Sequence, residues 1–329
     1  MRASTVPISA TTPSEQRWGG VVAAAVTVLV WTSFIVIARA SADPSRGAVL
    51  APWDIALCRI VGASVILLPW SWWLTRGPGA TNRTAGALGG LSPLPWPVLV
   101  RTGFFGGLMY AVLAYQGFVY APAAHASVLM PGSLPLWTSL LAWALLGESI
   151  NRGRLLGLAC IVGGDLLVGG GSLLLALQGG TTWRGDLLFM GAAFSWACYS
   201  VMARRYQLDA VRATMAVTAF AALCFIPLYA VLVATGLTHS RLAEAPWSAI
   251  LFQATYQGWG SVVISGISFT KMIQHFGPVR STMITALVPG LSALAAVAVL
   301  GEPLHLNLLL GLALVTLGIL FGVRSGRSQ

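Results

Sequence analysis

Residues 135–164 read PLWTSLLAWALLGESINRGRLLGLACIVGG, and residues 289–318 read PGLSALAAVAVLGEPLHLNLLLGLALVTLG. A shift of 154 residues superposes the two stretches and matches these pairs: Pro135 with Pro289, Gly147-Glu148 with Gly301-Glu302, Gly157 with Gly311, and Gly164 with Gly318. Shared leucine and alanine arise by chance in an apolar chain, but a shared glutamate is unusual in one with nine acidic residues. The chain therefore contains one structural unit twice.

The composition of the whole chain indicates that lipid surrounds this unit. Of the 329 residues, 57% are apolar and only 9% are charged, against about 25% charged residues in an ordinary soluble domain. A soluble chain of this length needs a charged exterior, which 19 basic and 9 acidic side chains cannot form. The composition excludes a cytosolic globular enzyme, a disordered protein and a small disulfide-bonded scaffold.

Ten apolar runs are long enough to cross a bilayer as helices, which takes about 20 residues each. The runs cover residues 19–38, 53–74, 98–121, 125–147, 155–173, 185–203, 211–235, 248–271, 279–300 and 306–323. Glycine and proline stand between them, as expected at helix ends. The fold class that follows is an all-α polytopic membrane protein with ten transmembrane helices.

Each copy of the repeated unit contains five of these spans. A second shift, of 165 residues, relates the starts of the copies and matches these pairs: Gly20 with Gly185, Trp31 with Trp196, and Arg39 with Arg204. A unit with an odd number of spans must insert its two copies in opposite orientations. Inverted repeats of this kind are typical of transporters, with the substrate site between the halves.

We expect the repeats to cover residues 19–173 and 185–323, joined by a linker over 174–184. Tails over 1–18 and 324–329 flank them. Basic residues orient the chain, because fourteen fall in segments on one side and four on the other, with Arg59 inside a span. Positive charge accumulates on the cytoplasmic side, so both termini are predicted to be cytoplasmic.

The spacing from Pro135 to Gly147-Glu148, followed by Gly157 and Gly164, resembles the closing segment of an EamA-type domain of the drug/metabolite transporter superfamily. The second copy, residues 289–318, carries the same pattern, and the resemblance covers residues 19–323. It implies a ten-helix secondary transporter of the inner membrane, more often an exporter than an importer, for amino acids, metabolites or amphipathic drugs. One departure is that Ser149 and Ile150 follow the first glutamate, where the family has a basic residue.

The resemblance also implies a central cavity lined by the first, third, fourth, sixth, eighth and ninth spans. Midspan residues there with aromatic, sulfur or polar side chains are the candidate substrate contacts: Trp31, Ser33, Tyr115, Gln116, Met130, Ser133, Trp196, Tyr199, Gln257, Thr282 and Thr285. A lining of this kind, with few polar anchors, favours a flat or amphipathic solute with little net charge. Packing between helices is the alternative role, and we expect it for about half of them.

Pro135 and Pro289 lie near the middle of the fourth and ninth spans. A proline inside a helix removes a backbone hydrogen bond and kinks the helix. Their matching depth favours a paired hinge beside the cavity over two static kinks. The glycines at 157, 164, 311 and 318 are expected to form close helix contacts rather than to touch substrate.

Arg59 and Asp165 lie well inside their spans, where an unpaired charge costs about 3 kcal/mol on insertion scales. Arg59 and Asp165 fall at similar depths, so we expect them to form an intramembrane ion pair, with proton coupling as the alternative role. Lys271, the single lysine, lies in the last two turns of the eighth span. It is a possible contact for a substrate anion, or it reaches the lipid headgroups instead.

Several classes of chemistry find no support in the sequence. The four cysteines lack CxxC spacing, and no HExxH or close His/acid cluster exists, so we expect neither a metal nor another cofactor. The scattered arginines form no patch for nucleic acid, and the absence of a GxxxxGK[ST] loop points to a gradient rather than ATP as the energy source. The expected partners are a small-molecule substrate and the bilayer, with a coupling proton left open. An importer or exchanger of the same fold is the alternative, and a polytopic membrane enzyme is a more distant one.

Overall fold

The structure, a computed structural model, describes residues 13–42, 47, 49–76, 86–121, 123–176, 179–285, 287–301 and 306–325. Within these ranges the chain is helical, and the only β pairing is an isolated bridge between Ala87 and Ser92. Large apolar side chains such as Trp18, Leu29 and Val65 are exposed on its outer surface, as expected where lipid rather than water is the neighbour.

The helices of the first half follow one another as the sequence pattern predicts. They are α1 (Pro13–Ala42), α2 (Pro52–Arg76), the short η2 (Leu88–Gly90), α3 (Trp96–Gly103), the π-helical η3 (Phe104–Met109), α4 (Tyr110–Tyr120), α5 (Ala123–Leu146) and α6 (Arg152–Ala176). Three of them, α3, η3 and α4, run on without a break and together form the third predicted span.

The second half has the same order. Its helices are α7 (Thr182–Arg205), α8 (Ala210–Ala234), α9 (Trp247–Gln253), the π-helical η4 (Ala254–Ile264), α10 (Ser265–Phe276), α11 (Pro278–Thr285), α12 (Val288–Leu300) and α13 (Leu306–Ser325). Here α9, η4 and α10 cover the residues predicted as the eighth span, and α11 and α12 cover those predicted as the ninth.

Among the described residues, seven helical stretches are long and apolar enough to cross a membrane. They are Trp18–Ala38, Pro52–Arg76, Trp96–Tyr120, His125–Leu146, Thr182–Arg205, Ala210–Ala234 and Pro278–Val299. Leu309–Phe321 is a shorter apolar helix. The chain is thus an all-helical, multi-pass membrane protein.

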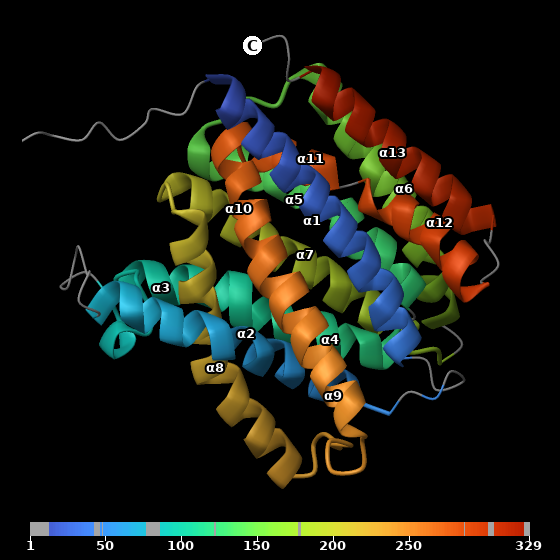
Figure 1. Ribbon diagram of the computed structural model, residues 1–329. Helices are drawn as coiled ribbons and strands as arrows, with labels where there is room; N and C mark the ends of the chain where they lie inside the picture. The colour runs from blue at the N-terminus through green and yellow to red at the C-terminus, as the bar shows by residue number, and fades with distance from the viewer. Residues whose placement is uncertain are drawn as a thin grey trace, which may run out of the picture.

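Glycines bring α6 and α13 into backbone contact, as their spacing predicts. A Cβ atom at Gly164 would lie 2.6 Å from the Gly311 carbonyl oxygen, and one at Gly318 would lie 2.5 Å from the Gly157 carbonyl oxygen. The shift of 154 residues converts the first contact into the second, so the pair has internal two-fold symmetry. The two helices run antiparallel, since the later glycine of each meets the earlier glycine of the other, and Figure 1 shows them side by side.

Two further features occur once in each half. Pro95 and Pro246 take extended conformations directly before Trp96 and Trp247, which begin helices. Each of these helices passes into a π-helical segment, η3 or η4, where the wider turn displaces the side chains that follow. In addition, α5 and α12 are both followed by a glycine with positive φ, Gly147 at 71° and Gly301 at 64°, the conformation in which helices commonly end.

The two prolines expected to form a matched hinge differ in their surroundings. Pro135 lies inside the continuous helix α5, together with Pro131. Pro289 stands in the first turn of α12, after α11 has ended at Thr285. The ninth predicted span is therefore interrupted directly before Pro289, whereas α5 continues through Pro135; proline is well tolerated in a first turn, where its missing amide hydrogen has no intrahelical partner to lose.

The start of α2 is held by a buried acid. Asp54 accepts hydrogen bonds from the Ala51 amide at 3.0 Å, from the Tyr229 hydroxyl at 2.6 Å and from the Arg241 amide at 2.9 Å. Its side chain thereby caps its own helix and fixes it to α8 and to the segment after α8. Buried carboxylates are stable when they accept several such bonds.

We expect Gly164→Ala to destabilise the protein by about 1–3 kcal/mol, because the added methyl group would collide with the backbone of α13. Gly318→Ala should have a similar effect, because its contact is the symmetry equivalent. Thermal unfolding of the purified protein in detergent measures both. Gly19→Ala is the matched control, since nothing lies within 4 Å of its Cβ position, and equal stability of all three variants would contradict the backbone contact.

Candidate functional site

A cavity lies at the centre of the bundle, where helices of both repeats meet. It consists of two adjoining hollows, and Arg59, Tyr110, Trp196 and Ser261 line both of them. The walls of the first hollow are completed by Trp31, Phe34, Ile35, Met130, Pro131, Leu134, Ala193, Ser265 and Val288. Helices α1, α2, α4, α5, α7, η4, α10 and α12 each contribute to this first hollow, so it lies at the junction of the two repeats.

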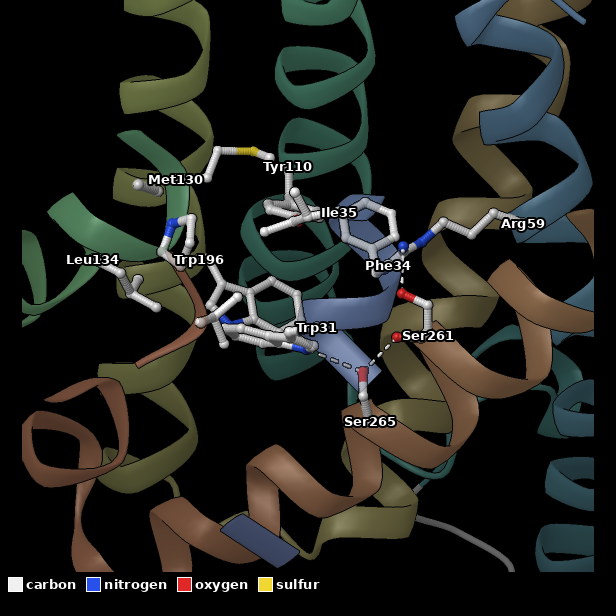
Figure 2. Close-up of a pocket in the computed structure, with 13 residues that line it drawn as sticks. Trp31, Phe34, Ile35, Arg59, Tyr110, Met130, Leu134, Trp196, Ser261 and Ser265 are labelled. Carbon is white, nitrogen blue, oxygen red and sulfur yellow. Dashed lines mark hydrogen bonds between the residues drawn. The ribbon is translucent and has the colours of Figure 1, made fainter. Parts of the chain in front are cut away.

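Aromatic rings form the floor of the cavity (Figure 2). The rings of Trp31 and Trp196 meet edge to face with their centroids 6.0 Å apart, and Phe269 stacks on Trp31 at 5.1 Å. Tyr110 and Tyr199 lie 5.0 and 5.1 Å from Trp196. Edge-to-face and stacked pairs at these distances are favourable, so the rings support each other and present flat apolar surface to the cavity.

Arg59 is the one charged residue among the described residues that line the two hollows. Its Nη1 atom donates a hydrogen bond to the Ser261 hydroxyl at 2.9 Å, and its guanidinium carbon lies 5.6 Å from the centre of the Phe34 ring. Figure 2 shows the side chain reaching from α2 toward the cavity, beside Phe34 and Ser261. A guanidinium has five N–H donors, and this environment supplies no carboxylate to balance its charge.

Hydrogen bonds link the polar side chains of the wall. Trp31 Nε1 donates to the Ser265 hydroxyl at 3.2 Å, and that hydroxyl donates to the Ser261 carbonyl at 2.6 Å. By contrast, Trp196 Nε1 is buried and has no partner among the described residues. Trp196 therefore differs from Trp31, whose indole N–H is hydrogen-bonded.

The structure places four of the eleven candidate contacts on the cavity wall, namely Trp31, Met130, Trp196 and Tyr199. The other seven do not line the two hollows. Ser133, Thr282 and Thr285 donate to carbonyls of their own helices. Ser33 accepts from the Tyr256 hydroxyl, and the amide oxygen of Gln116 accepts from Trp53 Nε1.

The remaining two are buried deeply. Tyr115 and Gln257 are 2% and 0% exposed, and neither lines the two hollows. Both amide atoms of Gln257 are buried without a hydrogen-bond partner among the described residues.

Several wall residues were not among the candidates. Phe34, Ile35, Leu134 and Val288 are apolar, so nothing in the sequence separated them from lipid-facing residues. Tyr110, Ser261 and Ser265 also line the wall and are polar. The two serines are four residues apart and so lie on about the same helix face, and that spacing could have identified the serines.

The predicted ion pair between Arg59 and Asp165 is not formed. Arg59 contacts Ser261 and Phe34, whereas both carboxylate oxygens of Asp165 are buried without a partner among the described residues. Asp165 lines a separate hollow between α5, α6 and α7. Similar depth in the bilayer did not bring the two charges together, because α2 packs on α8 and η4 while α6 packs on α5 and α13.

Lys271 is exposed and lines neither hollow of the central cavity. A polar hollow of about 880 Å³ lies at the same end of the bundle, near Phe276 and the start of α11. Arg154, Arg204 and Arg280 line it, and Arg154 pairs with Glu148 at 3.6 Å. The structure thus gathers three of the arginines predicted to be cytoplasmic around one opening.

A family model matches both halves of the chain, over residues 18–170 and 183–324. The chain belongs to the EamA-like transporter family. It is a membrane transporter with two EamA repeats, and this membership argues against an enzyme.

Proteins of other organisms resemble this chain at low identity. An uncharacterized transporter of Bacillus subtilis, YyaM, is 25% identical over 68% of this chain and 70% of its own length. A WAT1-related protein of Arabidopsis thaliana is 24% identical over 84% of this chain and 78% of its own. A crystal structure aligns with 94% of this chain and 98% of its own at a TM-score of 0.61 and 23% identity, which shows that the fold is shared.

We expect Trp31→Phe to destabilise this EamA-like transporter by about 1 kcal/mol more than Trp196→Phe. Both changes remove an indole from the same aromatic cluster, but only Trp31 donates a hydrogen bond, and a net bond contributes about that much. Unfolding of the two variants, measured without added solute, gives the difference. Equal stabilities would contradict the bond between Trp31 and Ser265.

Proposed function

We propose that the chain is a secondary transporter that carries a small organic solute through the central cavity by alternating access. The observation that carries the proposal is that both repeats build the cavity wall. Motion of one repeat against the other would therefore change access to the cavity from either side, as in transporters with inverted repeats. The full proposal includes ten membrane-crossing segments with both termini in the cytoplasm.

The cavity wall favours a flat organic anion as the solute. Trp31, Trp196 and Tyr110 would pack against an aromatic or planar body, and Arg59 would bind a carboxylate or similar group through its free donors. This refines the sequence interpretation of a solute with little net charge. The reason is that Arg59 lies in the cavity instead of being neutralised by Asp165.

The direction that we propose is export, as the family resemblance implies. The arginine-lined hollow near Arg154 and Arg280 would then face the cytoplasm, in agreement with the positive-inside rule. Such a basic opening would also attract an anionic solute from the cytoplasm. Import or exchange through the same cavity is the alternative.

Unequal movement of the halves follows from the helices that line the cavity. In the first repeat, α5 carries Pro131 and Pro135 within one helix, so it can bend at that point. In the second repeat, α11 and α12 are separate helices, with Pro289 in the first turn of α12. We propose that both sites act as hinges, the second as a joint between two rigid helices.

Counterflow in proteoliposomes tests transport itself. Vesicles with the purified protein are loaded with unlabelled 2-naphthoate, and uptake of labelled 2-naphthoate is compared with that of empty vesicles. We expect faster uptake only when protein and internal solute are both present. If 2-naphthoate and a panel of labelled amino acids, nucleosides and cationic drugs all fail to move, the proposal of a transporter through this cavity is wrong.

Arg59→Gln should weaken binding of 2-naphthoate by about 10- to 100-fold, because a hydrogen bond to a charged group contributes about 1.5–3 kcal/mol. Titration calorimetry with 2-naphthoate and with its neutral amide measures the effect. The variant should bind the amide about as well as the unaltered protein does.

Lys271→Gln is the matched control, since it removes a cation that lies outside the cavity. We expect it to bind 2-naphthoate normally. A loss of affinity in Lys271→Gln but not in Arg59→Gln would assign the anion contact to Lys271 instead.

A further inference from the structure

Asp165 is a buried acid for which the central cavity gives no explanation. Its side chain is 6% exposed, and both carboxylate oxygens lack a hydrogen-bond partner among the described residues. Asp54, the other buried acid of the first repeat, accepts three hydrogen bonds. An ionised carboxylate without any such bond is strongly disfavoured in an apolar interior, and such groups take up a proton instead.

The surroundings of Asp165 form a hollow of about 500 Å³ with mostly apolar walls, to which Leu129, Leu136, Val162 and Met190 contribute. A second acid, Asp186 of α7, lines the same hollow. Asp186 pairs with His125 of α5 at 2.8 Å, and the His125 side chain is 23% exposed. The three groups thus run from the partly exposed His125, through Asp186, to the buried Asp165.

Few other charged or titratable groups approach Asp165. The helices packed on α6 are α5, α7 and α13. Besides His125 and Asp186, α7 contributes Arg184, which is exposed and lies over the Trp183 ring at 5.7 Å. The described side chains of α13 include no titratable group, and the nearest one on α6 itself is Cys160.

On its other side, Asp165 faces the part of α5 that contains its two prolines. A Cβ atom at Gly132 would lie 3.6 Å from Asp165 Oδ1, so no side chain separates the carboxyl group from this part of α5. Gly132 stands between Pro131 and Pro135. Because proline has no amide hydrogen, Pro135 cannot donate the usual intrahelical hydrogen bond to the carbonyl of Pro131.

We propose that Asp165 is a proton-binding site that controls the conformation of α5 around its two prolines. When it is protonated, its hydroxyl can donate a hydrogen bond to the Pro131 carbonyl, which Pro135 leaves without its usual donor. When it is ionised, it has no hydrogen to donate and repels that carbonyl. The only bond that forms and breaks at Asp165 is the O–H bond of its carboxyl group. Water outside the protein supplies and accepts the proton, which passes by way of His125 and Asp186.

The same part of α5 connects this site with the cavity, because Met130, Pro131 and Leu134 line the cavity wall. Protonation at Asp165 would therefore alter the shape of the cavity without any contact between proton and solute. This link between the proton and the cavity rests on the proposed transport function. It would make Asp165 the residue that couples proton binding to transport.

Two measurements on the purified full-length protein without solute test the proton site. Infrared difference spectra recorded as the pH is changed should show a protonated carboxyl group at neutral pH that is absent from Asp165→Asn and retained in Asp186→Asn. Hydrogen exchange of the segment 127–137, corrected for the intrinsic effect of pH, should depend on pH in the unaltered protein. It should lose that dependence in Asp165→Asn.

A carboxyl band that persists in Asp165→Asn, or pH-dependent exchange of α5 that the variant retains, would overturn the proposal. Neither readout requires a transported solute. A failure of counterflow would therefore count against the transporter proposal alone, and a failure here would count against the proton site alone.

Discussion

Lipid offers no hydrogen bonds to a polar side chain, so every buried charge in this chain depends on partners within the protein. The three charged residues Asp54, Arg59 and Asp165 meet this constraint to different degrees. Asp54 accepts three hydrogen bonds and fixes α2 to α8. Arg59 donates one hydrogen bond to the Ser261 hydroxyl and lies over the Phe34 ring, and the Asp165 carboxylate has no hydrogen-bond partner among the described residues. Asp54, with its three hydrogen bonds, holds the framework, and the two residues with fewer partners are those that we propose to bind a solute and a proton.

The two-fold repeat determines where the cavity forms. Backbone contact between the glycines of α6 and α13 joins the repeats along one edge, with equivalent residues exchanged across the pair. The cavity lies where the other helices of both repeats converge. Close, rigid packing at the edge and a less complete packing at the centre are compatible with motion of one repeat against the other.

The symmetry is not complete, and the departure concerns the helices that line the cavity. Between residues 123 and 146 the first repeat has one helix with two prolines, and between residues 278 and 300 the second repeat has two separate helices. Asp165 has no acidic counterpart, because the shift of 154 residues carries it onto Ile319. The proposed proton site therefore belongs to one repeat only and would bias that half alone.

The sequence by itself determined the membrane class, the duplicated unit and the family, because composition and the spacing of proline, glutamate and glycine are properties of the linear chain. The close contact of the repeated glycines followed as well, since small residues at helical spacing let backbones approach. Only the tertiary structure decided which polar residues reach the cavity, and it separated Arg59 from Asp165. The physical reason is that a membrane-spanning helix is apolar on all sides, so its sequence carries no amphipathic pattern to distinguish the cavity face from the lipid face. Depth along a helix can be counted in residues, but the direction in which a side chain points depends on the neighbours against which the helix packs.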